Sequence, residues 1–78
     1  MQKENLVELS GTVETVVYKN EESGFAVLEL DHEGELVTVV GELASVGEGE
    51  MLTLHGSFRT HPNYGAQFKA VAAQQRLP

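Results

Sequence analysis

Apolar and polar side chains alternate with a period of two along most of this chain. The odd positions near its beginning form a mostly apolar series: Val7, Leu9, Gly11, Val13, Thr15 and Val17. Charged and hydroxylated residues lie between them. No stretch repeats an apolar residue at the i, i+3, i+4, i+7 spacing of an amphipathic helix for three turns. The pattern predicts an all-β domain in which each strand buries one face.

Two glycines interrupt the alternation in the middle of expected strands. Gly11 lies in the first series, and Gly56 lies between Leu54 and Phe58 in a second series that begins at Leu52. Glycine weakens a strand unless the backbone must bend or approach another backbone closely. We therefore expect Gly11 to be the point at which a long strand coils around a small barrel, and Gly56 to repeat the device.

Turn sequences divide the chain into five expected strands, at 7–17, 25–30, 36–41, 51–60 and 67–75. Residues 20–24, 32–34 and 62–65 have the Asn, Gly and Pro composition of turns. Between the third and fourth strands, Leu43 and Val46 are spaced by three and are followed by Gly47 and Gly49. This spacing predicts one short helical turn that plugs an opening of the barrel.

The alternation also predicts the core, which we expect to contain Leu9, Val13, Phe25, Val27, Val37, Val39, Leu52, Leu54, Phe58 and Phe68. On this interpretation, Phe58→Ala should cost about 3 to 5 kcal/mol.

Five short strands in 78 residues are more stable as a closed barrel than as an open sheet, because closure removes the edges and buries the apolar faces. A long bent first strand, a three-strand meander, a short connecting element and a final hairpin are typical of the OB barrel. The alternative is an SH3-like barrel, whose longest excursion usually lies between its first two strands. Here only about five residues, 20–24, separate them. We expect residues 1–78 to form a single OB-like domain.

Charge is sorted along the sequence, whose net charge is −7. Residues 20–50 contain nine acids and no base, whereas residues 51–78 contain Arg59, Lys69 and Arg76 and no acid. Affinity for phosphate comes from clustered Lys and Arg. We therefore expect the isolated domain to bind single-stranded DNA weakly or not detectably at physiological salt.

Several kinds of site lack sequence support. The chain has no cysteine and no run of eighteen apolar residues, so nothing indicates disulfides, a signal peptide or a membrane span. We expect a cytoplasmic domain without a membrane partner. The spacing of His32, His55 and His61 matches no common zinc site, and no nucleophile or phosphate-loop motif occurs. The sequence predicts no catalytic residue and no metal site.

Aromatic and basic residues supply the candidates for contact with single-stranded DNA, because bases stack on aromatic rings and phosphates attract cations. The candidates are Tyr64, Arg59, Lys69, Tyr18 and Lys19. Tyr64 is the best of them, since it lies in the turn between strands four and five, a loop that lines the ligand face of OB folds. The alternative for Tyr64 is a ring packed over its own turn. The acids of strands two and three, Glu29, Asp31, Glu33 and Glu35, would oppose phosphate and should face away from DNA.

Four segments resemble the N-terminal domain of RecD-like ATP-dependent DNA helicases. They are Gly-Thr-Val-Glu at 11–14, Asn-Glu-Glu-Ser-Gly-Phe-Ala-Val-Leu at 20–28, Val-Val-Gly at 39–41, and His-Pro-Asn-Tyr-Gly-Ala-Gln-Phe at 61–68. The second and fourth are the most specific, and the resemblance spans nearly the whole chain.

The resemblance implies an N-terminal accessory module, itself non-catalytic, of a superfamily-one, exodeoxyribonuclease V alpha-like helicase. Such a helicase moves 5′ to 3′ on single-stranded DNA in repair and recombination. ATP and Mg²⁺ would belong to the motor, with no cofactor in this fragment. Arg76-Leu77-Pro78 would start the link to helix-hairpin-helix-like modules.

Two functions stay open at this point. The module could guide single-stranded DNA near the motor. It could instead be an architectural or protein-docking barrel that meets other domains of the same chain or a repair or replication protein, without direct DNA contact.

Overall fold

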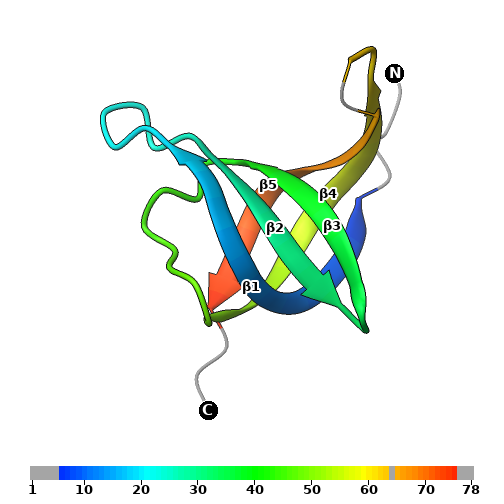
Figure 1. The fold of residues 1–78 in the computed structure, drawn as a ribbon, viewed down its shortest axis with the longest axis horizontal. Coiled ribbons are helices and arrows are strands. Elements are labelled where there is room, and N and C mark those ends of the chain that lie inside the picture. The colour runs from blue at the N-terminus through cyan, green and yellow to red at the C-terminus, as the bar shows by residue number, and fades with distance from the viewer. Residues whose placement is uncertain (1–5, 64, 76–78) are drawn as a thin grey trace.

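Five strands close into a barrel in the computed structural model, which describes residues 6–63 and 65–75 (Figure 1). The strands are β1 (Val7–Lys19), β2 (Ala26–His32), β3 (Glu35–Gly41), β4 (Met51–His61) and β5 (Gly65–Gln75). Their order around the barrel is β1-β2-β3-β5-β4, and all pairs are antiparallel except β3 and β5. The predicted all-β, five-stranded closed barrel is confirmed. No helix long and apolar enough to cross a membrane occurs in the described residues.

β1 belongs to both sides of the barrel, because its first half pairs with β4 and its second half pairs with β2. Gly11 lies next to the point of transfer, where Thr12 is opposite both Met51 and Asp31. A Cβ atom on Gly11 would overlap the carbonyl oxygen of Asp31. Only glycine permits this close approach, which confirms the predicted coil point.

Gly56 serves the same purpose on β4. It is buried, and a Cβ atom there would overlap the carbonyl oxygen of Lys69 on β5. The β4–β5 register shifts at this position, from His55 opposite Ala72 to Gly56 opposite Ala70. The strand pair can therefore bend here without a side chain in the way.

The turns between the strands follow from local chemistry. The Asn20 Oδ1 atom accepts hydrogen bonds from the backbone N–H groups of Glu22 (2.9 Å) and Ser23 (3.2 Å) and so stabilises the β1–β2 turn. Glu33 (φ 51°) and Gly34 (φ 89°) are both left-handed, as a type I′ hairpin requires. The turns expected at 20–24 and 32–34 are confirmed.

The core consists of eleven buried apolar side chains: Leu9, Val13, Ala26, Leu28, Leu30, Val39, Leu43, Val46, Leu52, Leu54 and Phe68. Six of them were predicted, and Val37 is only partly buried against them. Among the described residues, no polar or charged side chain is buried.

The core prediction was wrong for β2, because the residues that face the interior are shifted by one position from those predicted. Ala26, Leu28 and Leu30 point into the barrel, so Phe25 is 40% exposed and Val27 is half-buried. Apolar residues occupy both faces of this strand, and the three residues that fill the barrel leave Phe25 free to pack on Tyr18. β1 also changes face, because the register irregularity between Val13 and Thr15 turns Val16 inward.

Phe58 was also predicted in the core, and it is 54% exposed. The reason is the length of β4, which runs past the closed part of the barrel to form a hairpin with β5. Phe58 lies opposite Phe68, and the edge of one ring meets the face of the other at 5.0 Å between centroids. Phe68 takes the buried place, as predicted.

The short helical turn expected between β3 and β4 is absent from residues 42–50. Two separate turns occur instead, with hydrogen bonds from Val46 N–H to the Leu43 carbonyl (3.1 Å) and from Glu50 N–H to the Gly47 carbonyl (3.3 Å). Reciprocal hydrogen bonds join Val13 to Gly49 and Glu50, and they hold the segment along β1. Leu43 and Val46 are nevertheless buried, so the expected apolar plug is present without the helix.

Candidate nucleic-acid interface

The outer face of the barrel brings residues from four strands into one row. The strand registers place Tyr18 opposite Val27, Val27 opposite Val40, and Val40 beside Lys69. The opposite face of these strands lines the barrel interior, so this row lies on the outside of the barrel. Its half-buried members, Val27 and Val40, form an apolar stripe there. The stripe ends at a lysine.

Two adjoining hollows lie on this face. One has a volume of about 520 Å³ and is lined by Val17, Tyr18, Val27, Glu29, Thr38 and Gln67. The other has a volume of about 310 Å³ and is lined by Val40, Arg59, Thr60, His61, Pro62, Gln67 and Lys69. Gln67 lines both, so the two hollows adjoin between the end of β1 and the β4–β5 hairpin.

An aromatic pair lies on one side of this face: Tyr18 lines the first hollow, and Phe25, which packs on it, lines a neighbouring groove. The rings of Tyr18 and Phe25 lie 6.3 Å apart between centroids at a tilt of 54°, and the two residues are 50% and 40% exposed. Exposed rings of this kind can stack with a nucleobase. Sequence reasoning identified Tyr18 but assigned Phe25 to the core. The signal that could have found Phe25 is the run of apolar residues on both faces of β2.

Two of the three predicted basic residues lie on the other side. Arg59 and Lys69 are exposed and line the same hollow. Lys19 is exposed at the end of β1, where it lies opposite Ala26, the residue after Phe25. The structure thus brings Tyr18, Arg59 and Lys69 to one face, while Tyr64 lies outside the described residues.

The acids of β2 and β3 are divided between two places. Asp31, Glu33 and Glu35 lie at the β2–β3 hairpin, at the opposite end of β2 from Phe25 (Figure 1). Six residue steps separate Ala26 from His32, which is about 20 Å along a strand. Glu29 is different, because it lines the same hollow as Tyr18. These acids were expected to face away from the candidate surface, and for Glu29 that expectation was wrong.

The histidines are apart from one another. His32 Nδ1 lies 2.6 Å from the carbonyl oxygen of Ser10, and His55 Nε2 lies 3.9 Å from a carboxylate oxygen of Glu8. Within the described ranges, no group of three or more His, Asp or Glu side chains could hold a metal ion.

Comparison with known proteins agrees with this architecture. A chain in the crystal structure of the S. pombe Stn1–Ten1 complex superposes with a TM-score of 0.71 at 15% sequence identity, over 91% of this chain and 57% of that one. At this identity the likeness shows the fold alone, and this chain spans just over half of the matched one. The model of the OB-fold domain of ATP-dependent DNA helicase YrrC matches residues 6–78. The resemblance to RecD-like helicases is thereby confirmed, and the chain belongs to the YrrC OB-fold domain family.

Proposed function

We propose that this domain is a non-catalytic accessory module of a RecD-like ATP-dependent helicase, and that its outer face contacts single-stranded DNA and steers it near the motor. The observation that supports the proposal is the pair of adjoining hollows, one lined by Tyr18, which packs on Phe25, and the other by Arg59 and Lys69. Rings and cations on one face are the combination that single-strand binding surfaces use.

The contact is weak on its own. The three bases near this face, Lys19, Arg59 and Lys69, are set against the nine acids of residues 20–50. Stacking adds about 1 to 3 kcal/mol per base, which corresponds to millimolar affinity at best without further contacts. The bulk of the attraction comes from the motor, and this domain sets the path of the strand.

The motor supplies the chemistry in this proposal. ATP and Mg²⁺ bind there, and this module takes no cofactor. The whole helicase moves 5′ to 3′ in the cytoplasm in DNA repair and recombination, in the manner of the exodeoxyribonuclease V alpha subunit. The module lies N-terminal to the motor and contacts other domains of the same chain.

The test is a titration of fluorescent oligothymidylate with the whole helicase at two salt concentrations. Tyr18→Ala with Phe25→Ala should weaken binding by about fivefold or more, through the loss of stacking. Arg59→Ala with Lys69→Ala should reduce the salt slope by about 0.7 per lost phosphate contact. Tyr64→Ala tests the remaining aromatic candidate.

Leu36→Ala is the matched control, because Leu36 is 60% exposed on β3 but lies near the acidic hairpin. It should leave DNA binding and DNA-free ATPase activity unchanged. Equal affinity and equal salt slopes in all variants would reject a DNA role for this face.

The second candidate function is a protein-docking or architectural barrel without DNA contact. The net charge of −7 and the exposed apolar side chains of Leu36 and Met51 favour it. It predicts that the four substitutions on the outer face leave DNA affinity unchanged while a repair or replication partner, or another domain of the chain, still binds.

A further inference from the structure

The second half of β5 borders a further groove, which shares Val40 and Lys69 with one hollow of the proposed DNA face and also includes Phe25. We propose that this groove binds an extended, positively charged peptide segment of a partner protein, which adds to β5 as an extra strand. The proposal concerns the edge of β5 at residues 70–75, none of which lines a hollow of the DNA face.

The first reason is that β5 has a free edge. It pairs with β4 along its length, as far as Gln75 opposite Leu52. It pairs with β3 only where Val39 meets Phe68 and Val40 meets Lys69. Beyond Lys69, no other described strand lies on the β3 side of β5. Alternate backbone N–H and C=O groups of a strand point toward each of its sides, so this stretch offers both to the groove.

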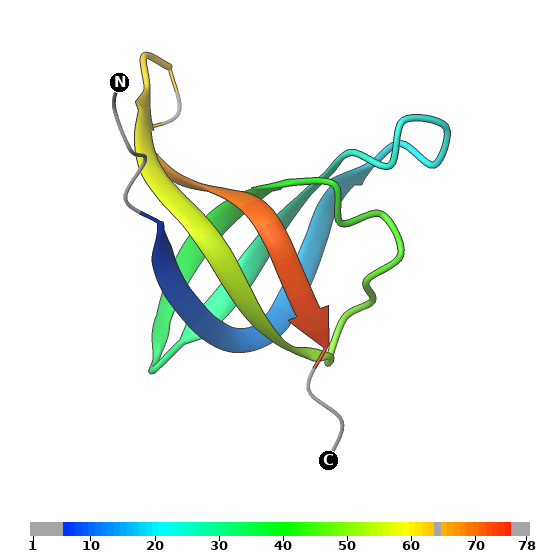
Figure 2. The same ribbon diagram turned by 180° about the vertical axis from the view of Figure 1, so that it is seen from behind.

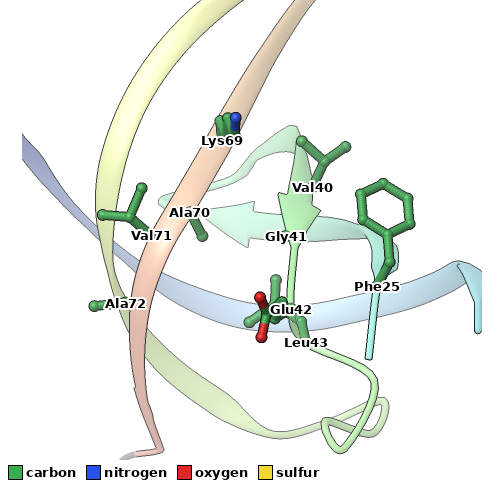
Figure 3. A pocket seen from close by; sticks show the side chains of 9 residues that line it. All are labelled: Phe25, Val40, Gly41, Glu42, Leu43, Lys69, Ala70, Val71 and Ala72. Atoms are coloured by element: carbon green, nitrogen blue, oxygen red, sulfur yellow. The ribbon is translucent and has the colours of Figure 1, made fainter. Parts of the chain in front are cut away.

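The second reason is the shape of the space beside that edge. β3 leaves β5 at Gly41, where a Cβ atom would lie 2.8 Å from the carbonyl oxygen of Ala70. The chain then runs toward β1, and a groove of about 550 Å³ remains, lined by Phe25, Val40, Gly41, Glu42, Leu43, Lys69, Ala70, Val71 and Ala72. Figure 3 shows β5 on one side of this groove and residues 40–43 on the other.

The groove has two ends, which limit the length of a bound segment. The pairing of Val40 with Lys69 closes one end. Beyond Ala72, the last residue of β5 that lines the groove, the side-chain amide of Gln75 donates a hydrogen bond to the carboxylate of Glu50. Figure 2 shows the end of β5 beside the end of the 42–50 segment. About five residues of β5 lie between Lys69 and Gln75, or roughly 17 Å of strand. A peptide of about five residues fits this length.

The third reason is that the edge carries no charge. Residues 70–75 read Ala-Val-Ala-Ala-Gln-Gln, without a charged residue or a proline, although charged residues make up 22% of the chain. Val71 is 58% exposed, and residues 71–75 are all exposed. Proteins usually place Lys or Pro on exposed edges to prevent pairing with another chain. An edge that lacks both residues is suited to pairing.

The rim of the groove selects the occupant. Glu42 and Lys69 are the charged residues that line the groove, and Lys69 lies at the end that its pairing with Val40 closes. On the side opposite β5, residues 42–50 contain Glu42, Glu48 and Glu50 without any base. Lys or Arg side chains of the peptide that face this segment would meet negative charge. A second copy of the chain would bring a charge of −7 and the same acidic segment, which disfavours self-pairing. A phosphodiester backbone would be repelled and lacks the alternating donors and acceptors that an edge strand recognises.

The experiment uses the peptide acetyl-Lys-Val-Thr-Val-Lys-amide as the probe and ¹⁵N amide exchange of the 78-residue chain as the readout. Peptide binding should slow exchange of the amides of residues 70–75. Glu42→Lys should weaken binding by about twofold to fivefold. Val71→Lys should weaken it by about fivefold or more, because a lysine on the edge blocks pairing and repels the basic peptide. Leu36→Lys, on an exposed position of β3 outside the groove, is the matched control and should have no effect.

Three results would overturn the proposal. The first is equal binding of a peptide whose backbone amides are all N-methylated, since that peptide cannot form a strand. The second is a dimer in sedimentation that Val71→Lys dissociates, because the occupant would then be a second copy. The third is displacement of the peptide by oligothymidylate that itself protects residues 70–75. Tyr18→Ala and Arg59→Ala of the DNA test change residues that do not line this groove, and Val71→Lys changes one that lines neither DNA hollow, so failure of one proposal is distinguishable from failure of the other.

Discussion

Phe58 and Phe68 face each other across β4 and β5 but should differ in their contributions to stability. Phe68 is fully buried, and Phe68→Ala should cost about 3 to 5 kcal/mol. Phe58 is 54% exposed, so slightly less than half of its side chain is removed from water. Full burial of such a side chain contributes about 1.5 to 3 kcal/mol, and the edge-to-face contact adds about 0.5 to 1.5 kcal/mol. Phe58→Ala should therefore cost about 1 to 3 kcal/mol, less than the sequence predicts.

Urea unfolding followed by circular dichroism measures both losses, and each kcal/mol should lower the thermal midpoint by about 4 to 8 °C in a domain of this size. The double variant should show a coupling of about 0.5 to 1.5 kcal/mol, because each single substitution removes the same ring contact. Phe68→Leu replaces Phe68→Ala if the latter does not fold. A loss for Phe58→Ala equal to that for Phe68→Ala would refute the placement of Phe58 at the rim.

Two further predictions concern the mid-strand glycine and the acid of the outer face. Gly56→Ala should cost at least about 2 kcal/mol in the same unfolding assay, because its Cβ would meet the Lys69 backbone, whereas a Cβ at Gly47 would meet only a side-chain oxygen of Glu50, at 3.1 Å, and Gly47→Ala should change stability by under about 1 kcal/mol. Glu29→Gln should raise the affinity of the helicase for oligothymidylate by about twofold to fivefold at low salt, and Glu35→Gln should not. Equal losses of stability for Gly56→Ala and Gly47→Ala would contradict the close approach at Gly56. Equal changes of affinity for Glu29→Gln and Glu35→Gln would contradict the placement of Glu29 in the hollow.

The elements that could be predicted from the sequence are those with a single strong local signal. Gly11 and Gly56 each interrupt an otherwise regular strand, and both prove to be points of backbone contact. Gly34 follows two polar residues between apolar runs and forms the expected hairpin turn. Five such strands in so short a chain leave few arrangements other than a closed barrel.

The errors arise where the local signal allows two answers. Residues 25–30 are apolar at both odd and even positions except Glu29, so alternation alone cannot choose the inward face. The choice depends on which side chains fill the barrel, and that is a property of all five strands together. Phe25, a member of the candidate site, was missed for this reason. Phe58 has the correct period for the core, but the period does not show where the barrel ends.

The net charge of −7 is a poor guide to what this surface can bind, because salt screens charges beyond a short distance. At physiological ionic strength the screening length is about 8 Å. The hairpin acids Glu33 and Glu35 are about 20 Å along β2 from Phe25, so their repulsion of a phosphate there is small. Glu29 differs, because it lines the same hollow as Tyr18. The charged side chains that line the two hollows are Glu29, Arg59 and Lys69, while Glu42 and Lys69 line the β5 groove. The same acidic chain can thus present one surface suited to a phosphate backbone and another suited to a basic peptide.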